Sequence, residues 1–374
     1  MSRAFFNRNA QVRVSTLLLF TAICPFKLLA DDGAASIAAG GLVARRETRV
    51  VMAKEVLHIS EKKVLVDYDF RNDTDEDVTT EVAFPVPPYK NYWDERDTAE
   101  QAFTDFKLEI DGKPARFQAE ANAMVKGKDV TSVLNADKID IATFGHFDQE
   151  KSGMNRTPDL ARLPERERKK LIALGLFDAN QDYADATWTV HLQYHWTQTF
   201  PAHASVHIRH EYSPVIGYSG VAPGEISYAL NPNSSDPVLK TYSVDQPANE
   251  RLSSFCADSP TLHALESGLQ RKEESIKDPQ DRTYAELGRQ WVDFILTTAN
   301  TWKQPIQDFT LIIERPKADA GERALISLCS PGPVEKPDAD HFQVHLTNFV
   351  PKAELHIGFF GVPLAAASQS KPRK

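Results

Sequence analysis

The chain has 374 residues, of which 41% are hydrophobic and 25% are charged. These values are typical of a folded protein and argue against large-scale disorder, and the length allows two domains or one large β domain. The formal net charge is −9. An acidic chain without a basic stripe binds phosphate backbones poorly, so we expect no nucleic-acid partner.

The first thirty residues have the layout of a secretory signal peptide. Three arginines precede a mostly apolar run at residues 14–23, and Ala30 is followed by Asp31. We therefore expect cleavage between Ala30 and Asp31 and a periplasmic or secreted protein. The run has half of the about 20 apolar residues that a membrane span needs, so we expect no stable membrane span after removal of the signal.

Alternating apolar and polar residues predict the first strands. Residues 63–70 and 78–84 each place apolar side chains at every second position, which is the period of a half-buried strand. The polar segment 72–77 between them has turn chemistry, and Pro85 cannot donate to a strand ladder. The pattern predicts an antiparallel hairpin that stops at Pro85.

Turn and helix signals follow in the next hundred residues. Asp111-Gly112 lies between two short alternating runs and predicts a second hairpin. From about residue 119 to 178 the alternation weakens, and we expect an insertion of loops and short helices. Its helices are predicted near residues 129–135 and 164–174, the latter opening on a proline and closing at a glycine.

The clearest strand covers residues 188–198, where aromatic and aliphatic side chains alternate with polar ones. A turn at residues 201–204 and a second alternating run at 206–212 predict another hairpin. Residues 217–250 are rich in glycine, proline, asparagine and serine and are predicted to cross to a second half. There, helical spacing predicts helices after Ser259-Pro260 and over residues 284–295.

Four further runs predict strands at residues 309–314, 324–329, 342–346 and 355–359. The predicted fold class is therefore mainly β (α+β). It comprises an antiparallel β-sandwich over residues 45–216 and a C-terminal antiparallel sheet with two helices over residues 250–362. The tail at residues 363–374 is expected to be loose.

Cysteine usage agrees with export. Cys24 lies in the predicted signal, which leaves Cys256 and Cys329 as an even pair. We expect these two residues to form a disulfide, because disulfides persist in exported proteins. Two buried free thiols are the alternative.

Histidines offer a candidate metal site. Five of the eleven histidines fall between residues 191 and 210. Within one strand a spacing of four residues spans about 13 Å, too far for one metal ion, so ligands would have to come from two strands. In the predicted hairpin, His195, His207 and Glu211 would lie on one face and could bind a metal. A solvated sheet face is the alternative interpretation.

Other motifs are incomplete. Residues 217–221 lack the second glycine of a nucleophile elbow. Two aspartate-rich segments, beginning at Asp73 and Asp178, lack the glycine and the final glutamate of a calcium loop, and turns explain them better. Trp196, Trp291 and Trp302 could form an aromatic ligand platform, although apolar spacing favours core positions for Trp196 and Trp291 and leaves Trp302, in a predicted helix-to-strand loop, the least explained. We identify no catalytic residue and expect no cofactor.

Several long motifs resemble a bacterial exported family catalogued as domain of unknown function 4424. They are AAGGLV (38–43), DYDFRNDTDEDVTTEVAFPVPP (67–88), WTQTFPA (196–202), HEYSPVIG (210–217), FILTTANTWKQPIQDFTLIIE (294–314) and SLC (327–329). The resemblance implies no activity. Residues 50–135 also look like the vault/inter-α-trypsin type of β-sandwich, which implies a fold rather than a function.

The leading functional hypothesis is a non-enzymatic binding or protein-interaction module of the cell envelope, with an envelope protein or a glycan as partner. It rests on the absence of a complete catalytic motif and on sheet faces joined by long loops. The alternative is a metal-dependent hydrolase or metal-binding protein that uses the histidine-rich segment 191–211.

Overall fold

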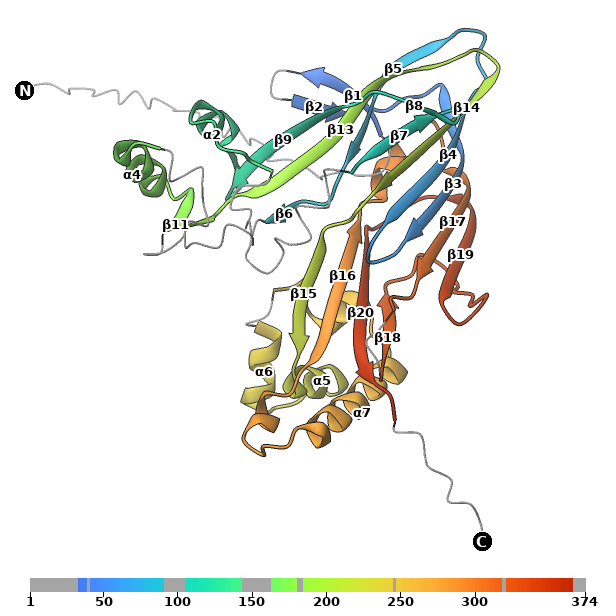
Figure 1. Ribbon diagram of the computed structural model, residues 1–374. Coiled ribbons are helices and arrows are strands. Elements are labelled where there is room, and N and C mark those ends of the chain that lie inside the picture. Colours follow the sequence, from blue (N-terminus) through green and yellow to red (C-terminus); the bar gives the residue numbers. More distant parts are fainter. Residues whose placement is uncertain are drawn as a thin grey trace, which may run out of the picture.

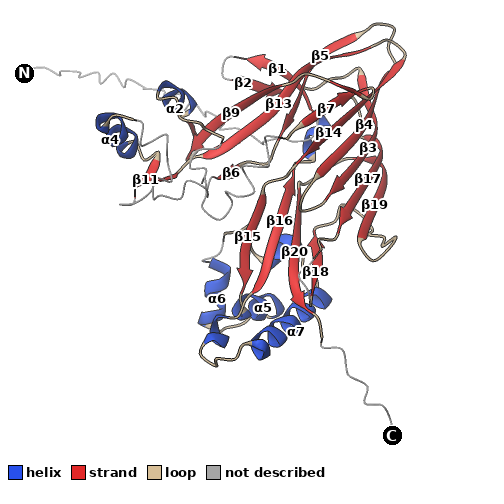
Figure 2. Ribbon diagram, in the orientation of Figure 1, coloured by secondary structure: helices blue, strands red, loops and turns tan. Residues whose placement is uncertain are grey.

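The computed structural model describes residues 33–38, 41–90, 105–142, 163–179, 184–244, 247–317 and 321–365. The predicted signal segment and its cleavage between Ala30 and Asp31 lie outside the described residues, as does most of the predicted tail. The described chain is mainly β, with several antiparallel sheets and few helices (Figures 1 and 2). The predicted fold class is therefore confirmed.

Two large sheets and one smaller sheet form the architecture (Figure 1). The β13 sheet contains, in spatial order, β10 (Lys128–Asp129), β9 (Gln118–Val125), β13 (Thr189–Phe200), β5 (Val78–Pro85), β1 (Gly33–Ala38) and β2 (Gly41–Ala44), and β6 (Tyr89–Lys90) also pairs with β13. The β4 sheet contains β19 (His341–Phe349), β17 (Ile306–Glu314), β3 (Val50–Ile59), β4 (Val64–Asn72), β14 (Ala204–Tyr212), β7 (Lys107–Ile110) and β8 (Lys113–Pro114). The β16 sheet contains β15 (Ile216–Val221), β16 (Leu287–Phe294), β20 (Leu355–Pro363) and β18 (Glu322–Leu328).

The remaining described elements are helices, 3₁₀ turns and a two-stranded ribbon. The helices are α2 (Thr131–Ala136), α4 (Glu165–Ala173), α5 (Pro223–Leu230), α6 (Pro237–Val244) and α7 (Ser259–Ser275), with 3₁₀ turns η2 (Leu252–Phe255), η3 (Asp281–Tyr284) and η4 (Thr297–Thr301). A small ribbon pairs β11 (Phe177–Ala179) with β12 (Ala184–Ala186). Helix α7 begins after Asp258, whose carboxylate accepts a hydrogen bond from the Thr261 amide at 2.9 Å. Helices α2 and α4 agree with the predictions near residues 129–135 and 164–174.

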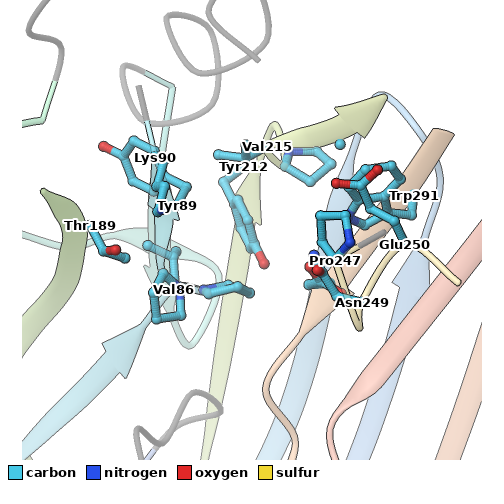
Figure 3. A pocket seen from close by; sticks show the side chains of 15 residues that line it. Val86, Tyr89, Lys90, Thr189, Tyr212, Val215, Pro247, Asn249, Glu250 and Trp291 are labelled. Atoms are coloured by element: carbon cyan, nitrogen blue, oxygen red, sulfur yellow. The ribbon is translucent and has the colours of Figure 1, made fainter. Parts of the chain in front are cut away.

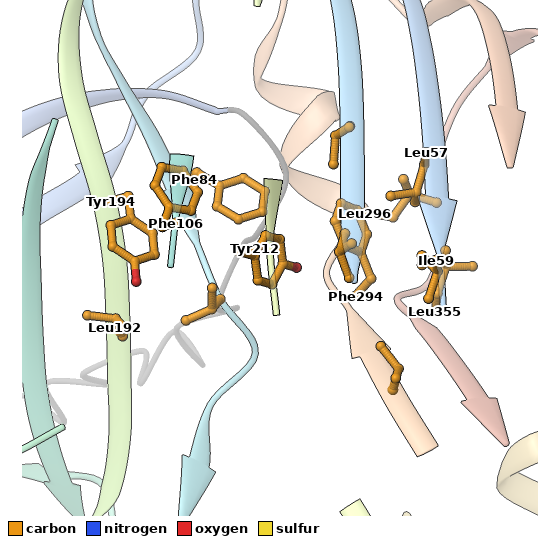
Figure 4. Close-up of a cluster of buried hydrophobic side chains, with 14 of the residues drawn as sticks. Leu57, Ile59, Phe84, Phe106, Leu192, Tyr194, Tyr212, Phe294, Leu296 and Leu355 are labelled. Atoms are coloured by element: carbon orange, nitrogen blue, oxygen red, sulfur yellow. The ribbon is translucent and has the colours of Figure 1, made fainter. Parts of the chain in front are cut away.

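The main core lies between the β13 and β4 sheets. Strand β4 buries every second residue, as its alternation predicts, and aromatic rings from both sheets meet there. The Phe106 ring stacks on Tyr194 with centroids 3.9 Å apart, and Phe70 contacts Phe200 at 5.6 Å. Figure 4 shows part of this core, with Phe106 and Tyr194 beside one another. Burial of these faces supplies the main stabilising free energy.

The hairpin predicted for residues 63–84 is wrong. Strand β4 pairs with β3 and β14, whereas β5 pairs with β13 and β1, so the segment between them is a corner that crosses from one sheet to the other. The buried amide of Asn72 holds this corner by donating to the carbonyl oxygens of Glu76 and Phe200 at 2.8 and 2.9 Å. Two strands that face one another across a core bury alternate residues just as a hairpin does, so alternation alone cannot separate the two arrangements.

The second predicted pairing, of residues 188–198 with 206–212, fails for the same reason. Strand β13 lies in one large sheet and β14 in the other. Residues 201–203, between β13 and β14, therefore form a second corner between the two sheets. It contacts the first corner, because the Ala202 amide donates to the Asp77 carboxylate at 2.8 Å. The hairpin at Asp111-Gly112 is confirmed: both residues have positive φ, at 50° and 71°, and β7 pairs with β8. Such angles are those of a two-residue hairpin turn.

The C-terminal half contributes to two sheets. The predicted strands at 309–314 and 342–346 correspond to β17 and β19, which extend the β4 sheet through a parallel pairing of β17 with β3. Residues 284–295, predicted as a helix, form mainly the strand β16. Leu287 and Trp291 are four residues apart, a spacing that suits both a helix face and a strand face. Arg289 lies buried between them, which removes the apolar alternation that would have indicated a strand.

A second, smaller core lies between the β16 sheet and the helices α5 and α7. Cys256 follows η2 and Cys329 follows β18, and their sulfur atoms lie at disulfide distance, with Cα atoms 4.9 Å apart. This is the predicted pair. Trp302 is not a ligand platform: it is 1% exposed and packs on Phe70 with ring centroids 4.6 Å apart.

A buried histidine in the main core predicts acid sensitivity. His210 is fully buried against Tyr68, Phe84 and Trp196, and burial lowers the pKa of its imidazole from 6.5 to about 3. Below pH 6.5 the unfolded chain binds this proton and the folded chain does not. The free energy of unfolding should therefore fall by about 1.4 kcal/mol for each pH unit between pH 6.5 and 3.

We expect His210→Leu to remove this component of the pH dependence. Urea denaturation of both proteins at pH 7 and pH 5 measures it. The wild type should lose about 2 kcal/mol more than the variant on acidification. Equal losses in the two proteins would show that His210 is protonated in the folded state.

Candidate functional site: a pocket where the sheets meet

The structure does not bring the predicted metal ligands together. His195 lies on β13, and its Nδ1 is 2.7 Å from the Glu81 carboxylate. His207 and Glu211 lie on β14, in the other large sheet. His207 pairs with Asp69 at 2.8 Å, and Glu211 accepts from Lys63 and Lys107 at 2.8 and 3.0 Å. Each of the three side chains has a charged partner of its own sheet, so residues 191–211 do not form the predicted site.

A pocket of about 350 Å³ opens where the β16 sheet meets the two large sheets (Figure 3). One wall comes from the segment that follows β5 and from β6, where Val86, Tyr89 and Lys90 lie. The opposite wall comes from residues 247–250 and from Trp291 of β16. Tyr212, at the end of β14, lies between the walls in Figure 3. The three sheets thus each supply part of one concave surface.

Local sequence explains why this surface is hollow. Prolines follow β5 and β14 at positions 87, 88 and 214, and because proline cannot donate to a ladder, they interrupt the strands here, which resume as β6 and β15. Gly217 on β15 lets the Trp291 ring lie against its backbone. A Cβ atom at this position would be 1.9 Å from Trp291 Cε2. Any other residue at position 217 would therefore displace the indole that lines the pocket.

Fixed polar groups line one side of the pocket. His356 on β20 stacks on Phe255 with centroids 4.1 Å apart. Its Nδ1 makes a short hydrogen bond with the Asp293 carboxylate, and its Nε2 donates to the carbonyl oxygen of Asn249 at 2.7 Å. One imidazole therefore orients both a carboxylate of the pocket and the loop that carries Asn249 and Glu250.

On the opposite wall of the pocket, the phenol of Tyr89 is held in place by a hydrogen bond. The Tyr89 hydroxyl donates to the carbonyl oxygen of Ala142 at 2.8 Å, and burial raises the pKa of this phenol, so it remains neutral at physiological pH. The described lining residues offer an amide, two carboxylates, an ammonium group and a hydroxyl, which can hold a polar ligand.

The sequence does not predict this pocket. It indicates only a strand end at residues 85–88 and a crossing segment at residues 217–250. One feature of the sequence does point to the pocket: proline-rich strand ends occur together with a glycine inside a strand. A glycine in a strand often marks a place where another group approaches the backbone closely. The residue that packs against Gly217 is Trp291. Because the sequence predicts a helix there, it does not indicate that these two residues meet.

One other group of side chains could hold a metal ion. Among the described residues, His58, Glu314 and His341 each place one ligand atom within 4.8 Å of the others. Burial lowers the pKa of the His58 imidazole. This group lies on the outer face of the β4 sheet, and none of its residues lines the junction pocket.

The fold and the pocket define a mainly β protein with two facing sheets, an appended sheet and a ligand-sized hollow between them. Residues 30–357 match the model of the domain of unknown function DUF4424, and the chain belongs to that family. No curated protein matches the chain. In the described residues, no helix has both the length and the apolar character to cross a membrane.

A solved structure from Legionella pneumophila subsp. pneumophila str. Philadelphia 1, described as a "putative nutrient binding protein", is similar to this chain. The identity is 15% and the TM-score is 0.39, and the match covers 88% of this chain and 70% of that chain.

Proposed function

We propose that this protein is an exported, non-enzymatic binding module of the cell envelope, and that its junction pocket holds a saccharide unit of a glycan. The observation that carries the proposal is the pocket itself. It has about 350 Å³ of space, within the range of about 300–1,000 Å³ that is usual for small-molecule sites. The cysteine pair at disulfide distance supports an oxidising compartment.

The chemistry of the lining supports a saccharide. Sugar rings present apolar C–H faces and several hydroxyl groups that both donate and accept hydrogen bonds. Trp291 and Tyr212 are 5% and 1% exposed, so only the edges of their rings reach the lining, while Asn249, Glu250 and Asp293 offer an amide and two carboxylates. An amide can donate and accept, and a carboxylate accepts from hydroxyls, so these three residues match neighbouring hydroxyl groups. The Asp293 carboxylate is held in place by His356, which reduces the entropy cost of binding.

Isothermal titration with N-acetylglucosamine, glucose, galactose and maltose tests the proposal. We expect at least one of these probes to bind, and the double variant Asn249→Ala/Glu250→Ala to weaken it about tenfold or more. The reason is that each lost hydrogen bond contributes about 1 kcal/mol, and 1.4 kcal/mol corresponds to a factor of ten. The fold should tolerate the change, because Ser254 and His356 bond to the backbone carbonyl of Asn249, which alanine retains.

Glu274→Ala provides the matched control, since Glu274 is an exposed carboxylate on α7, away from the pocket lining. This variant should bind the sugar as the wild type does. Binding that is unchanged in the double variant, or a complete lack of binding by all four probes, would contradict the proposal. Glycyl-glycine serves as a probe of different class, and a preference for it over every sugar would reject a saccharide ligand.

A further inference from the structure

Three adjacent strands bring two histidines and a glutamate together at one end of the β4 sheet. In the parallel pair β3 and β17, His58 is opposite Ile312, and Glu314 follows two positions later on the same face. In the antiparallel pair β17 and β19, Glu314 is directly opposite His341. The alternation of each strand points these three side chains away from the core, which Leu57, Ile313 and Phe342 fill.

The distances suit a single metal ion. The three ligand atoms lie within 4.8 Å of one another, and His58 Nε2 is 3.7 Å from the Glu314 carboxylate. Zinc–ligand bonds of about 2.0–2.2 Å in a tetrahedron place ligand atoms roughly 3.4 Å apart. Small rotations of side chains that are about one-third to one-half exposed would close the remaining difference.

His58 Nε2 gives an independent indication of a ligand. This nitrogen is buried and has no hydrogen-bond partner, because its distance to Glu314 exceeds hydrogen-bond length. A buried polar atom without a partner costs free energy of roughly 1–3 kcal/mol. A metal ion bound at this nitrogen would satisfy it.

His341 is oriented as metal-binding histidines are. Its Nδ1 lies 2.8 Å from the Asp338 carboxylate, which also accepts the backbone amides of Asp340 and His341 at 2.8 Å each. A carboxylate that holds one ring nitrogen fixes the tautomer and leaves the other nitrogen for the metal. The turn at residues 338–341 therefore positions His341 where β19 begins.

A cavity beside the group gives an ion access to it. Glu314 and His341 line this cavity of about 530 Å³, whose described lining also holds the carboxylates of Glu322 and Asp340 and the cationic side chains of Arg315, Lys317 and Arg323. Two neutral imidazoles and one carboxylate form the ligand set of many zinc sites that keep an open position.

We propose that His58, Glu314 and His341 bind one zinc ion per chain, with Asp338 as the positioning residue for His341 and with a solvent-accessible fourth position. This site is separate from the saccharide pocket and does not depend on the proposed function. It also replaces the predicted His195, His207 and Glu211 set with residues that converge in space.

Titration of tag-free, EDTA-treated protein with ZnCl₂, followed by calorimetry and elemental analysis, tests the proposal. We expect one equivalent of zinc, and X-ray absorption should show two imidazole nitrogens and a carboxylate oxygen at about 2.0–2.2 Å. His341→Ala and Glu314→Gln should each weaken binding more than about 100-fold. Asp338→Asn should weaken it by roughly 10- to 100-fold, as outer partners of metal ligands do.

His345→Ala is the matched control. His345 lies on the same face of β19 and pairs with Asp308 at 2.8 Å, but it is not one of the three ligands. It should bind zinc as the wild type does. Circular dichroism checks folding, and the near-isosteric Glu314→Gln and Asp338→Asn keep the test decisive if an alanine variant fails to fold. Lack of stoichiometric zinc, or equal weakening by His345→Ala and Glu314→Gln, would reject the site in favour of non-specific surface binding.

Discussion

Replacing Glu225 by alanine should reduce the free energy of unfolding by about 3–5 kcal/mol, because it leaves the Arg289 guanidinium buried without its counter-charge. Arg289 on β16 is fully buried, and Glu225 on α5 is 3% exposed. Their nearest atoms, Arg289 Nη1 and Glu225 Oε1, are 2.7 Å apart. The pair joins the helix to the sheet inside the smaller core, and urea denaturation of wild type and variant measures the effect.

The double variant Arg289→Met/Glu225→Leu separates the cost of a lone charge from the value of the pair. Burying two charges is costly, so well-packed apolar replacements of similar volume often restore stability. We expect the double variant to recover most of the loss. Ser219 Oγ accepts hydrogen bonds from Arg289 Nε and Nη2 at 2.9 and 2.7 Å. The double variant removes both donors, so the recovery of stability should be incomplete.

The exposed pair of Lys169 and Glu165 on α4 provides the control, since its side chains are 75% and 69% exposed. Glu165→Ala should change stability very little, because solvent screens such pairs. If Glu225→Ala were as mild as Glu165→Ala, water would reach Arg289 in the native protein and the packing of α5 on β16 would be incorrect.

Removing the cysteine pair should have a comparable effect. Cys256→Ser/Cys329→Ser opens a loop of 73 residues, and the loss of this constraint on the unfolded chain corresponds to about 4 kcal/mol. The cross-link joins the end of η2 to the end of β18, so it ties the segment before α7 to the β16 sheet. Thermal and urea unfolding of the double variant and of the oxidised wild type measure the difference.

Free-thiol titration of the denatured wild type is the accompanying control. The oxidised mature chain should have no free thiol, since Cys24 lies in the predicted signal segment. Two reactive thiols in freshly purified protein, together with unchanged stability of the double variant, would mean that the pair is not bonded in the native protein.

The strands could be predicted from the sequence, but their partners could not. Alternation at residues 63–70 and 188–198 identifies which side chains enter the core, because the strand period is two residues. The pairing of β4 with β14, instead of β5, depends on corners such as the one held by Asn72. The parallel pairing of β17 with β3 joins residues about 250 positions apart, and no local pattern contains that information.

The candidate sites were harder to predict for a related reason. Histidine density at residues 191–210 drew attention to His195 and His207, but their strands belong to different sheets and each has its own carboxylate. The group of His58, Glu314 and His341 has no spacing that a sequence motif would detect, because its members come from three separate strands. A site assembled by long-range pairing becomes visible only when the register is known.

Hydrogen–deuterium exchange with and without a bound saccharide, the tightest binder among the four probes, tests the central claim most directly. We predict slower exchange in peptides that contain residues 86–90, 212–217 and 247–250, which line the junction pocket, and no change in the strands β17 and β19. Protection confined to the outer face of the β4 sheet, or protection nowhere in the chain, would contradict a binding pocket at the junction of the sheets.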